Sequence, residues 1–272
     1  MKEGFEQIVK EIKEIKIQGA DNIAKAGISA FLKKPEISSA KKILSARPTE
    51  PLLQNSINIL LNSKSLRKDS EKIMKYIKES ERKISEKGEK LIKKEMNIFT
   101  HCHSSSVISI LKLAKKKKKD FVVYNTETTP KLQGRRTALE LAKAGIKVIH
   151  LPDSAIEFAV RKCDLVLVGA DAFHKNGVVN KIGTSIICKI AKTHRIPVYS
   201  CGISMKYAKK VKIEFRKGKE VWDERSKLIE PVYPAFDFTR KIFITGVVSE
   251  FGILNYNDFI KKAKENLKKF NQ

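Results

Sequence analysis

The sequence predicts an α/β protein in two parts: a helical N-terminal domain over residues 1–93 and a Rossmann-like domain with a mainly parallel sheet over residues 94–272. Apolar residues recur at helical spacing throughout the first part. In the second part, short runs rich in β-branched residues alternate with helix-period segments. That alternation is typical of parallel strands joined by right-handed crossovers. We expect the second domain to carry most of the functional site.

The N-terminal part should contain several helices separated by breaks. Residues 5–15 have helical spacing, and Gly19 separates them from a second helix for which Asp21 is a candidate N-cap. The proline-containing segment 46–51 reads as a loop before a further helix, because the residue before a proline disfavours helix. A long charged helix should then run from 65 to 93.

The second part should contain six main strands. The predicted strands are MNIFTHC (96–102), FVVYNTE (121–127), KVIHL (147–151), LVLVGAD (165–171), PVYSCGI (197–203) and KIFITGVVS (241–249). Helix-period segments fall at 104–117, 135–144, 154–163 and 183–194. The nearly continuous apolar run in LVLVGA suits a central strand that is covered on both faces.

The net charge is +26, from 56 Lys and Arg against 30 Asp and Glu. Such a field attracts phosphate, whether on nucleic acid, on anionic lipid or on a small metabolite. The lysines are spread over many predicted helix faces, and the run KKKKK at 115–119 suits a solvated helix end, where cations interact favourably with the helix dipole. RNA binding would rest on charge alone, since we find no aromatic platform or known RNA-binding motif.

Other bulk features exclude several classes. No apolar run approaches the roughly 20 residues that cross a bilayer, and no signal peptide is evident, so we expect a cytoplasmic protein that does not bind membranes. The four cysteines form no CxxC pair, which argues against a zinc ribbon or a disulfide framework. We also find no P-loop or GxGxxG fingerprint, so ATP and dinucleotide binding are poorly supported.

Chemistry-bearing residues follow the predicted strands. Ligands of open parallel sheets bind outside the carboxyl ends of the strands, where the sequence has Cys102, Glu127, Asp153, Asp171 and the segment CGISMK. Two helix starts add anion-binding potential, because their first backbone N–H groups are free. One begins near Ser104, and the other begins at Gly183 and Thr184, just after Lys181. The pattern suggests two phosphate sites.

Cys102 lies between His101 and His103 at a strand-to-helix turn. Successive strand residues point to opposite faces, so both histidines should face away from the thiol and a metal site is not expected. Cys102 is then either a small buried residue or a thiol with thiolate character gained from the helix start. Asp171 is either a turn cap or a buried acid with a raised pKa suited to proton transfer.

The remaining cysteines are less informative. Cys163 and Cys188 fall within helix patterns and should lie in the core, whereas the role of Cys201, near a strand end, stays open.

Several motifs together resemble one known family: THCHSS, TETTPKLQGRRTALEL, LPDSA, VGADAFHKNGVVNKIGT and PAFDFT, with IQGADNIAKAG and ARPTEPLLQNS in the helical part. The family contains the alpha, beta and delta regulatory subunits of translation initiation factor 2B, methylthioribose-1-phosphate isomerase and archaeal ribose-1,5-bisphosphate isomerase. Within it, the chain most resembles the archaeal ribose-1,5-bisphosphate isomerases and archaeal initiation factor 2B-like proteins. The resemblance covers nearly the whole chain.

The resemblance implies an aldose–ketose isomerase of AMP metabolism, with Cys102 and Asp171 as its catalytic residues. The isomerases are similar in carrying a catalytic cysteine in THCN and a catalytic aspartate in GAD. Ribose 1,5-bisphosphate is the favoured substrate, and the resemblance implies that Arg47, Asn180, Lys181 and Lys206 hold its phosphates and hydroxyls. The full expected substrate-binding set is Gln18, Gly19, Arg47, Ser104, Ser105, Glu127, Arg135, Asn180, Lys181 and Lys206.

Two departures from the family pattern favour an alternative. The isomerases usually have arginine at the position of Gln18 and asparagine at that of His103, and glutamine supplies neither the charge nor the fork of an arginine. A non-catalytic regulatory subunit, binding a nucleotide or sugar phosphate and contacting initiation factor 2, is therefore the second hypothesis. The family implies a homodimer through the α/β domain, or a homohexamer built as a trimer of dimers, and leaves a nucleotide effector such as AMP open.

The chemistry is also consistent with the residues themselves. Phosphate on the anomeric oxygen blocks simple ring opening, so a workable route protonates the ring oxygen and removes the C2 proton through an enol that retains the phosphate. We expect the Cys102 thiolate to take the C2 proton and Asp171 to handle ring opening and proton return. This route needs no cofactor, whether metal or redox.

Overall fold

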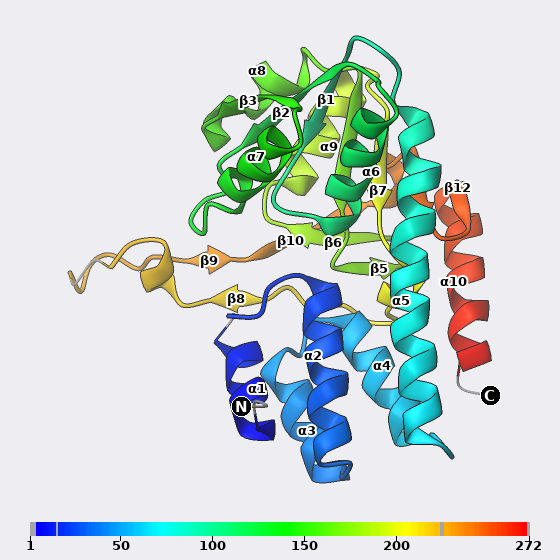
Figure 1. The fold of residues 1–272 in the computed structure, drawn as a ribbon. Helices are drawn as coiled ribbons and strands as arrows, with labels where there is room; N and C mark the ends of the chain where they lie inside the picture. The colour runs from blue at the N-terminus through cyan, green and yellow to red at the C-terminus, as the bar shows by residue number, and fades with distance from the viewer. Residues whose placement is uncertain (1–3, 15, 224–225, 271–272) are drawn as a thin grey trace.

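A computed structural model describes residues 4–14, 16–223 and 226–270. The described N-terminal region is helical, as predicted, and contains α1 Phe5–Lys13, α2 Ala20–Lys33, α3 Ile37–Ala46, α4 Pro51–Leu61 and α5 Leu66–Gly88. The long helix expected over 65–93 ends at Gly88, where the short 3-10 turn Glu89–Leu91 follows. The later helices are α6 Ser105–Lys116, α7 Gln133–Lys143, α8 Ile156–Val160, α9 Thr184–Thr193 and α10 Tyr256–Phe270. Figure 1 shows the first four helices below the sheet, with α5 running alongside both regions.

The main sheet has seven strands in the order β12-β11-β7-β4-β1-β2-β3. These strands are β1 Met96–Thr100, β2 Phe121–Thr126, β3 Lys147–Leu151, β4 Leu165–Gly169, β7 Val198–Cys201, β11 Gly246–Ser249 and β12 Gly252–Leu254. All neighbouring pairs are parallel except β11 and β12. The six predicted strands are therefore confirmed, and the α/β fold with a mainly parallel sheet is as predicted.

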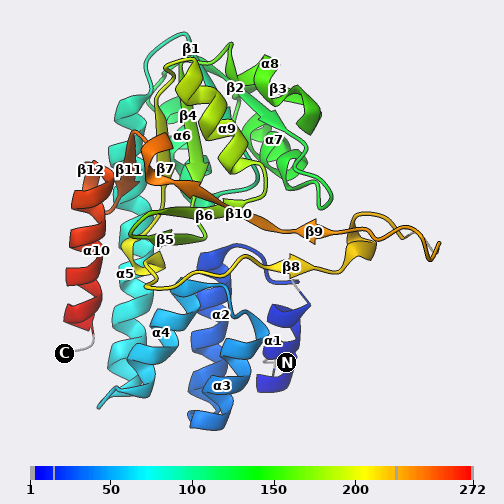
Figure 2. The same ribbon diagram turned by 180° about the vertical axis from the view of Figure 1, so that it is seen from behind.

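Helices cover both faces of this sheet (Figures 1 and 2). Alternate residues of one strand enter different cores, as strand geometry requires: Ile98 joins the core shared with α6 and the N-terminal helices, whereas Phe99 joins the core beneath α8 and α9. The first core continues from α2 and α4 into the sheet without a break. The boundary at residue 93 follows the end of the N-terminal helices, and its status as a domain boundary stays a prediction.

Two smaller sheets were not predicted. The first joins β5 Ala172–His174, β6 Gly177–Lys181 and β10 Phe236–Arg240 in antiparallel order. The second pairs β8 Phe215–Arg216 with β9 Tyr233–Pro234. The described residues from β8 to β9, 215–223 and 226–234, project from the body in both views, and we call them the arm.

The lysine run 115–119 lies at the end of α6, as predicted. Two of its lysines are not simply solvated, because Lys117 and Lys119 both bind the buried carboxylate of Glu89. Cys163 and Cys188 are buried in the core as expected, and Cys201 is fully buried as well.

Candidate active site

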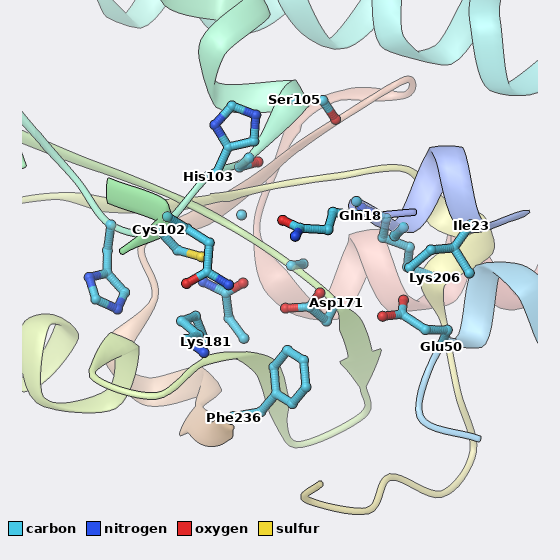
Figure 3. A pocket seen from close by; sticks show the side chains of 18 of the residues that line it. Gln18, Ile23, Glu50, Cys102, His103, Ser105, Asp171, Lys181, Lys206 and Phe236 are labelled. Carbon is cyan, nitrogen blue, oxygen red and sulfur yellow. The ribbon is translucent and has the colours of Figure 1, made fainter. Parts of the chain in front are cut away.

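A cavity lies between the helical region and the carboxyl ends of β1 and β4. Cys102 follows β1 and Asp171 follows β4, and both line the cavity. Figure 3 shows their side chains together with Lys181 and Lys206. The predicted substrate-binding residues that also line it are Gln18, Gly19, Arg47, Ser104, Ser105, Asn180, Lys181 and Lys206. Both parts of the chain thus build one cavity.

Cys102 has a left-handed backbone, with φ of 63°. The predicted strand through Cys102 in fact ends at Thr100. A cysteine in this region is strained and persists only where its surroundings hold it. The Cys102 N–H donates to Thr128 Oγ1 at 3.1 Å, and its carbonyl accepts from Thr137 Oγ1 at 2.7 Å. The loop after β2, through Thr128, and helix α7, through Thr137, therefore hold the thiol at the cavity.

The expected thiolate character of Cys102 is wrong for this structure. Burial raises the pKa of the thiol to about 12, although Lys181 opposes the shift. The start of α6 at Ser105 does not offset the loss of water around the sulfur. Cys102 is therefore a thiol at neutral pH, and Lys181 is a cation that would favour its thiolate form.

The chain leaves strand geometry at Thr100, before it reaches the two histidines that flank Cys102. His101 and His103 both line the cavity. His103 Nδ1 lies 3.1 Å from Thr137 Oγ1, and since that hydroxyl donates to Cys102, the imidazole must donate to the hydroxyl. Burial, aided by Arg136, lowers the pKa of His103 to about 4, so the ring is neutral at physiological pH. Among the described residues, no cluster of His, Cys, Asp and Glu is arranged to hold a metal ion.

Asp171 agrees with the interpretation of an acid with a raised pKa, although its residue is only partly buried. Burial raises the pKa of its carboxyl above the usual range, and Lys206, Arg47 and Lys181 oppose that shift. Its backbone N–H donates to the carbonyl of Val179 at 2.9 Å, which ties the end of β4 to β6. An acid in this state retains a proton at a pH where an exposed aspartate has lost it.

Three buried cations surround the acid. Arg47 Nη2 donates to Glu50 Oε1 at 2.7 Å, and its Nη1 lies 3.9 Å from Glu214 Oε1. Lys181 donates to the hydroxyl of Tyr233. These cations, with Lys206, are at most 7% exposed. Positive charge in a concave, poorly hydrated site focuses potential that favours phosphate.

Asp21 does not cap α2, contrary to the sequence prediction. The helix begins at Ala20, and Gly19 occupies the N-cap with φ of 87°, a conformation that favours glycine. Asp21 is buried instead, accepting from Ser105 Oγ at 3.1 Å and lying 4.0 Å from Lys206 Nζ. Burial alone would raise the pKa of Asp21, but Lys206 and hydrogen bonds hold it below the usual value.

The two helix starts differ. At α6, Ser104 caps the helix by accepting from the Val107 N–H at 3.4 Å, and Ser104 faces the cavity. At α9, the expected phosphate site is wrong, because Asp237 accepts from the N–H groups of Gly183 at 2.8 Å and Ser185 at 3.0 Å. An anion there would meet a carboxylate, so only the α6 start keeps the predicted character.

Glu127 and Arg135 do not line this cavity. They pair with each other outside it, with Arg135 Nη2 at 2.5 Å from Glu127 Oε1. The next residue, Arg136, lines the cavity instead. Asp153, also expected at this edge, accepts from the N–H groups of Thr128 at 2.9 Å and Thr129 at 2.7 Å and so supports the loop that holds Cys102.

Among the charged, amide and aromatic side chains that line the cavity, sequence reasoning missed Glu50, Gln133, Arg136 and Phe236. Gln133 and Arg136 lie inside the motif TETTPKLQGRRTALEL and Phe236 in PAFDFT, so a signal for their importance was present. Glu50 gave no signal, because a charged residue between two prolines reads as an exposed loop.

Together, the fold and the site define an α/β protein with a partly buried thiol, a partly buried acid and several cations in one cavity. A model of the initiation factor 2 subunit family matches residues 3–256. The ribose 1,5-bisphosphate isomerase of Archaeoglobus fulgidus is 32% identical, over 91% of this chain and 88% of that protein. A putative translation initiation factor eIF-2B subunit 2-like protein of Pyrococcus furiosus is 31% identical, over 91% and 95%.

The fold has a close structural counterpart. The crystal structure of translation initiation factor eIF-2B from Pyrococcus horikoshii OT3 superposes with a TM-score of 0.84 at 26% identity, covering 92% of this chain and 96% of that chain. The chain therefore belongs to the initiation factor 2 subunit family, whose members similar to it include sugar-phosphate isomerases. None of the helices in the described part of the chain has the length and apolar character needed to cross a membrane.

Proposed function

We propose that this protein is an aldose–ketose isomerase that converts ribose 1,5-bisphosphate into ribulose 1,5-bisphosphate. The observation that carries the proposal is the presence of Cys102 and Asp171 in one cavity with three buried cations. The relative from A. fulgidus, a ribose 1,5-bisphosphate isomerase by name, supports the choice of substrate. A doubly phosphorylated sugar also matches the charge of the cavity.

Each proton has a defined route in this proposal. Asp171 donates to the ring oxygen as the bond from C1 to that oxygen breaks. Cys102 removes the proton from C2 as the thiolate, its minor form at neutral pH, which the charge of Lys181 favours. The result is an enol that retains the C1 phosphate. Proton return to C1 and loss of the 2-hydroxyl proton to Asp171 then give the ketose. Acid–base groups of this kind contribute roughly 10²–10⁴-fold each.

The phosphates are assigned to the cations. Arg47, Lys181 and Lys206, with Asn180, hold the phosphates and hydroxyls, and Gln18, Gly19, Ser104 and Ser105 complete the substrate pocket; all of these line the cavity. Arg136 is the further cation of the cavity wall. It adds positive charge to a site that has glutamine at position 18.

A regulatory subunit of the initiation factor 2B type is the second candidate. The glutamine at position 18 and the resemblance to the subunit 2-like protein of P. furiosus favour it. In that case the same cavity would bind a nucleotide or sugar phosphate without turnover, and the protein would contact initiation factor 2.

We also propose that the protein is a homo-oligomer, at least a dimer. The arm carries exposed apolar side chains, including Phe215, Trp222 and Leu228, and two-stranded ribbons of this kind are marginally stable alone. Burial against a second copy would cover them.

Incubation with ribose 1,5-bisphosphate, followed by phosphorus NMR, tests the proposed activity. We expect ribulose 1,5-bisphosphate to form with the wild type and not with Cys102→Ser. If the folded wild type binds the bisphosphate but does not convert it, the isomerase proposal is wrong and the regulatory subunit becomes the better one.

A further inference from the structure

Glu50 occupies a position that its local sequence does not explain. It precedes α4 at the N-cap, yet its side chain makes no capping hydrogen bond. It is only 2% exposed and lines the cavity instead. In Figure 3 its carboxyl is directed at Asp171.

The two carboxylate oxygens of Glu50 have unequal surroundings. Oε1 accepts from Arg47 Nη2 at 2.7 Å, whereas Oε2 is a buried oxygen without a hydrogen-bond partner. A buried, unpartnered carboxylate oxygen costs several times what a typical hydrogen bond contributes. The cost disappears if the oxygen carries a proton that a neighbouring acceptor can share. Asp171 is the candidate acceptor, because the Glu50 carboxyl is directed at it (Figure 3).

The surrounding charges favour one proton on the pair. The cations acting on the two carboxyls are Arg47, Lys206 and Lys181, and a further carboxylate, Glu214, lies beside Arg47. Lys206 is also shared with Asp21, at 4.0 Å. Two carboxyls in one buried cavity cannot both ionise without strong repulsion, so one of them keeps its proton. Burial and the charge of Asp171 raise the pKa of Glu50 to about 7, in the same direction as that of Asp171.

We propose that Glu50 is a positioning residue of the active site, which shares one proton with Asp171 and so keeps Asp171 able to act as an acid. The catalytic role of Glu50 rests on the proposed function, whereas the sharing of a proton between Glu50 and Asp171 does not depend on it. The shared proton passes to the ring oxygen as the bond to C1 breaks, leaving both carboxyls ionised. Their repulsion then favours recovery of a proton from the 2-hydroxyl, which restores the pair.

Infrared difference spectra test the shared proton without any turnover. The spectra of Glu50→Gln, Asp171→Asn and the double variant are each subtracted from that of the wild type at pH 6. The bands of the other acids with a raised pKa, Glu81 and Asp237, are common to all four proteins and cancel in the difference. We expect each single variant to lose the same protonated-carboxyl band and the double variant to lose no more. Retention of the band in either single variant, or loss of two bands in the double variant, would overturn the proposal.

Kinetics test the catalytic consequence. Glu50→Gln keeps an oxygen that accepts from Arg47, so we expect KM to change by less than about threefold while kcat falls about tenfold or more. The matched control is Asp237→Asn, which removes an acid whose pKa is also raised, to about 6, but which does not line this cavity. It should keep kcat within about twofold. An equal fall of kcat in both variants would show a general effect of lost negative charge and contradict the specific role of Glu50.

If the wild type itself has no isomerase activity, the proposed function fails, while the infrared result still tests the shared proton.

Discussion

Glu50 and Glu89 are both almost completely buried, at 2% and 3% exposure, yet their environments differ in kind. Lys117 and Lys119 bind the two oxygens of Glu89, and Lys119 also donates to its carbonyl at 2.6 Å. Burial would raise the pKa of Glu89, but these lysines hold it below the usual value. Glu50 has one cation on one oxygen, a second oxygen without a partner, and a pKa raised to about 7.

The difference separates two uses of buried charge. Glu89 is satisfied by the protein alone and joins the end of α5 to the end of α6. Glu50 lies at a cavity and is left partly unsatisfied, which is typical of groups whose partner is a proton or a ligand. Substitutions around Glu50 should therefore change activity, and substitutions around Glu89 should change stability.

The largest expected effect is on the cavity side. Cys102→Ser should lower kcat by roughly 10²–10⁴-fold, because serine is far less acidic than cysteine and cannot serve as the base. The melting temperature should stay close to that of the wild type, since Cys102 is held through its backbone. Turnover and thermal unfolding measured on the same preparation check both parts. Near-normal turnover in the variant would exclude Cys102 as the base.

The paired substitutions Glu89→Gln and Glu50→Gln should act in opposite ways. Glu89→Gln leaves two lysines without their carboxylate, and we expect it to lose about 1–3 kcal/mol of the free energy of unfolding with little change in kcat. Glu50→Gln should lower kcat without a comparable loss of stability at pH 8. Denaturant unfolding and kinetics on both variants give the comparison, which fails if both lose stability equally.

The pH dependence of stability should also have opposite signs. A raised pKa means that the folded state binds the Glu50 proton more tightly than the unfolded chain. Its stabilisation is present at pH values below the ordinary pKa near 4.5 and is lost as the pH rises through about 7. For Glu89 the pKa is lowered, so its stabilisation is present above the ordinary value and is lost as the pH falls. Denaturant unfolding of the wild type and of each glutamine variant, repeated between pH 4 and 8, gives the difference in the free energy of unfolding at each pH. The account fails if this difference changes with pH in the same direction for both variants.

The smallest expected effect concerns Gln18. Gln18→Arg adds a planar cation at the cavity and leaves the Glu89 cluster untouched, so we expect KM for the bisphosphate to fall about three- to tenfold with unchanged stability. Measured affinities of wild type and variant at two salt concentrations check this, because the gain should shrink as salt rises. Weaker binding by the variant would show that the cavity already has its full complement of cations.

Much of the fold was predictable because the main strands are long, apolar and separated by helix-period segments. The antiparallel sheet was missed because β5 has only three residues, although Asn176-Gly177 in its connection to β6 is a turn signal. The arm pairs two residues from each strand, which leaves no periodicity to detect.

The site was predictable to the extent that it follows the strand ends. Cys102 and Asp171 lie at the edge that parallel topology indicates, and they meet in one cavity. The state of the thiol was not predictable, because it depends on burial and on the left-handed backbone at Cys102. The occupation of the α9 start by Asp237 depends on a strand more than fifty residues away in sequence. Glu50 reaches the cavity only because α4, which it precedes, packs against the segment Ser204–Lys206 that follows β7.

The most direct test of the central claim is the reaction of ribose 1,5-bisphosphate in deuterium oxide, with the product analysed by proton and carbon NMR. Isomerisation by proton transfer through Cys102 and Asp171 passes through an enol, so the account predicts deuterium at C1 of ribulose 1,5-bisphosphate. Product with no deuterium at C1, together with near-normal turnover by Cys102→Ser, would contradict the account, because it would indicate direct hydride transfer from C2 to C1 without the thiol.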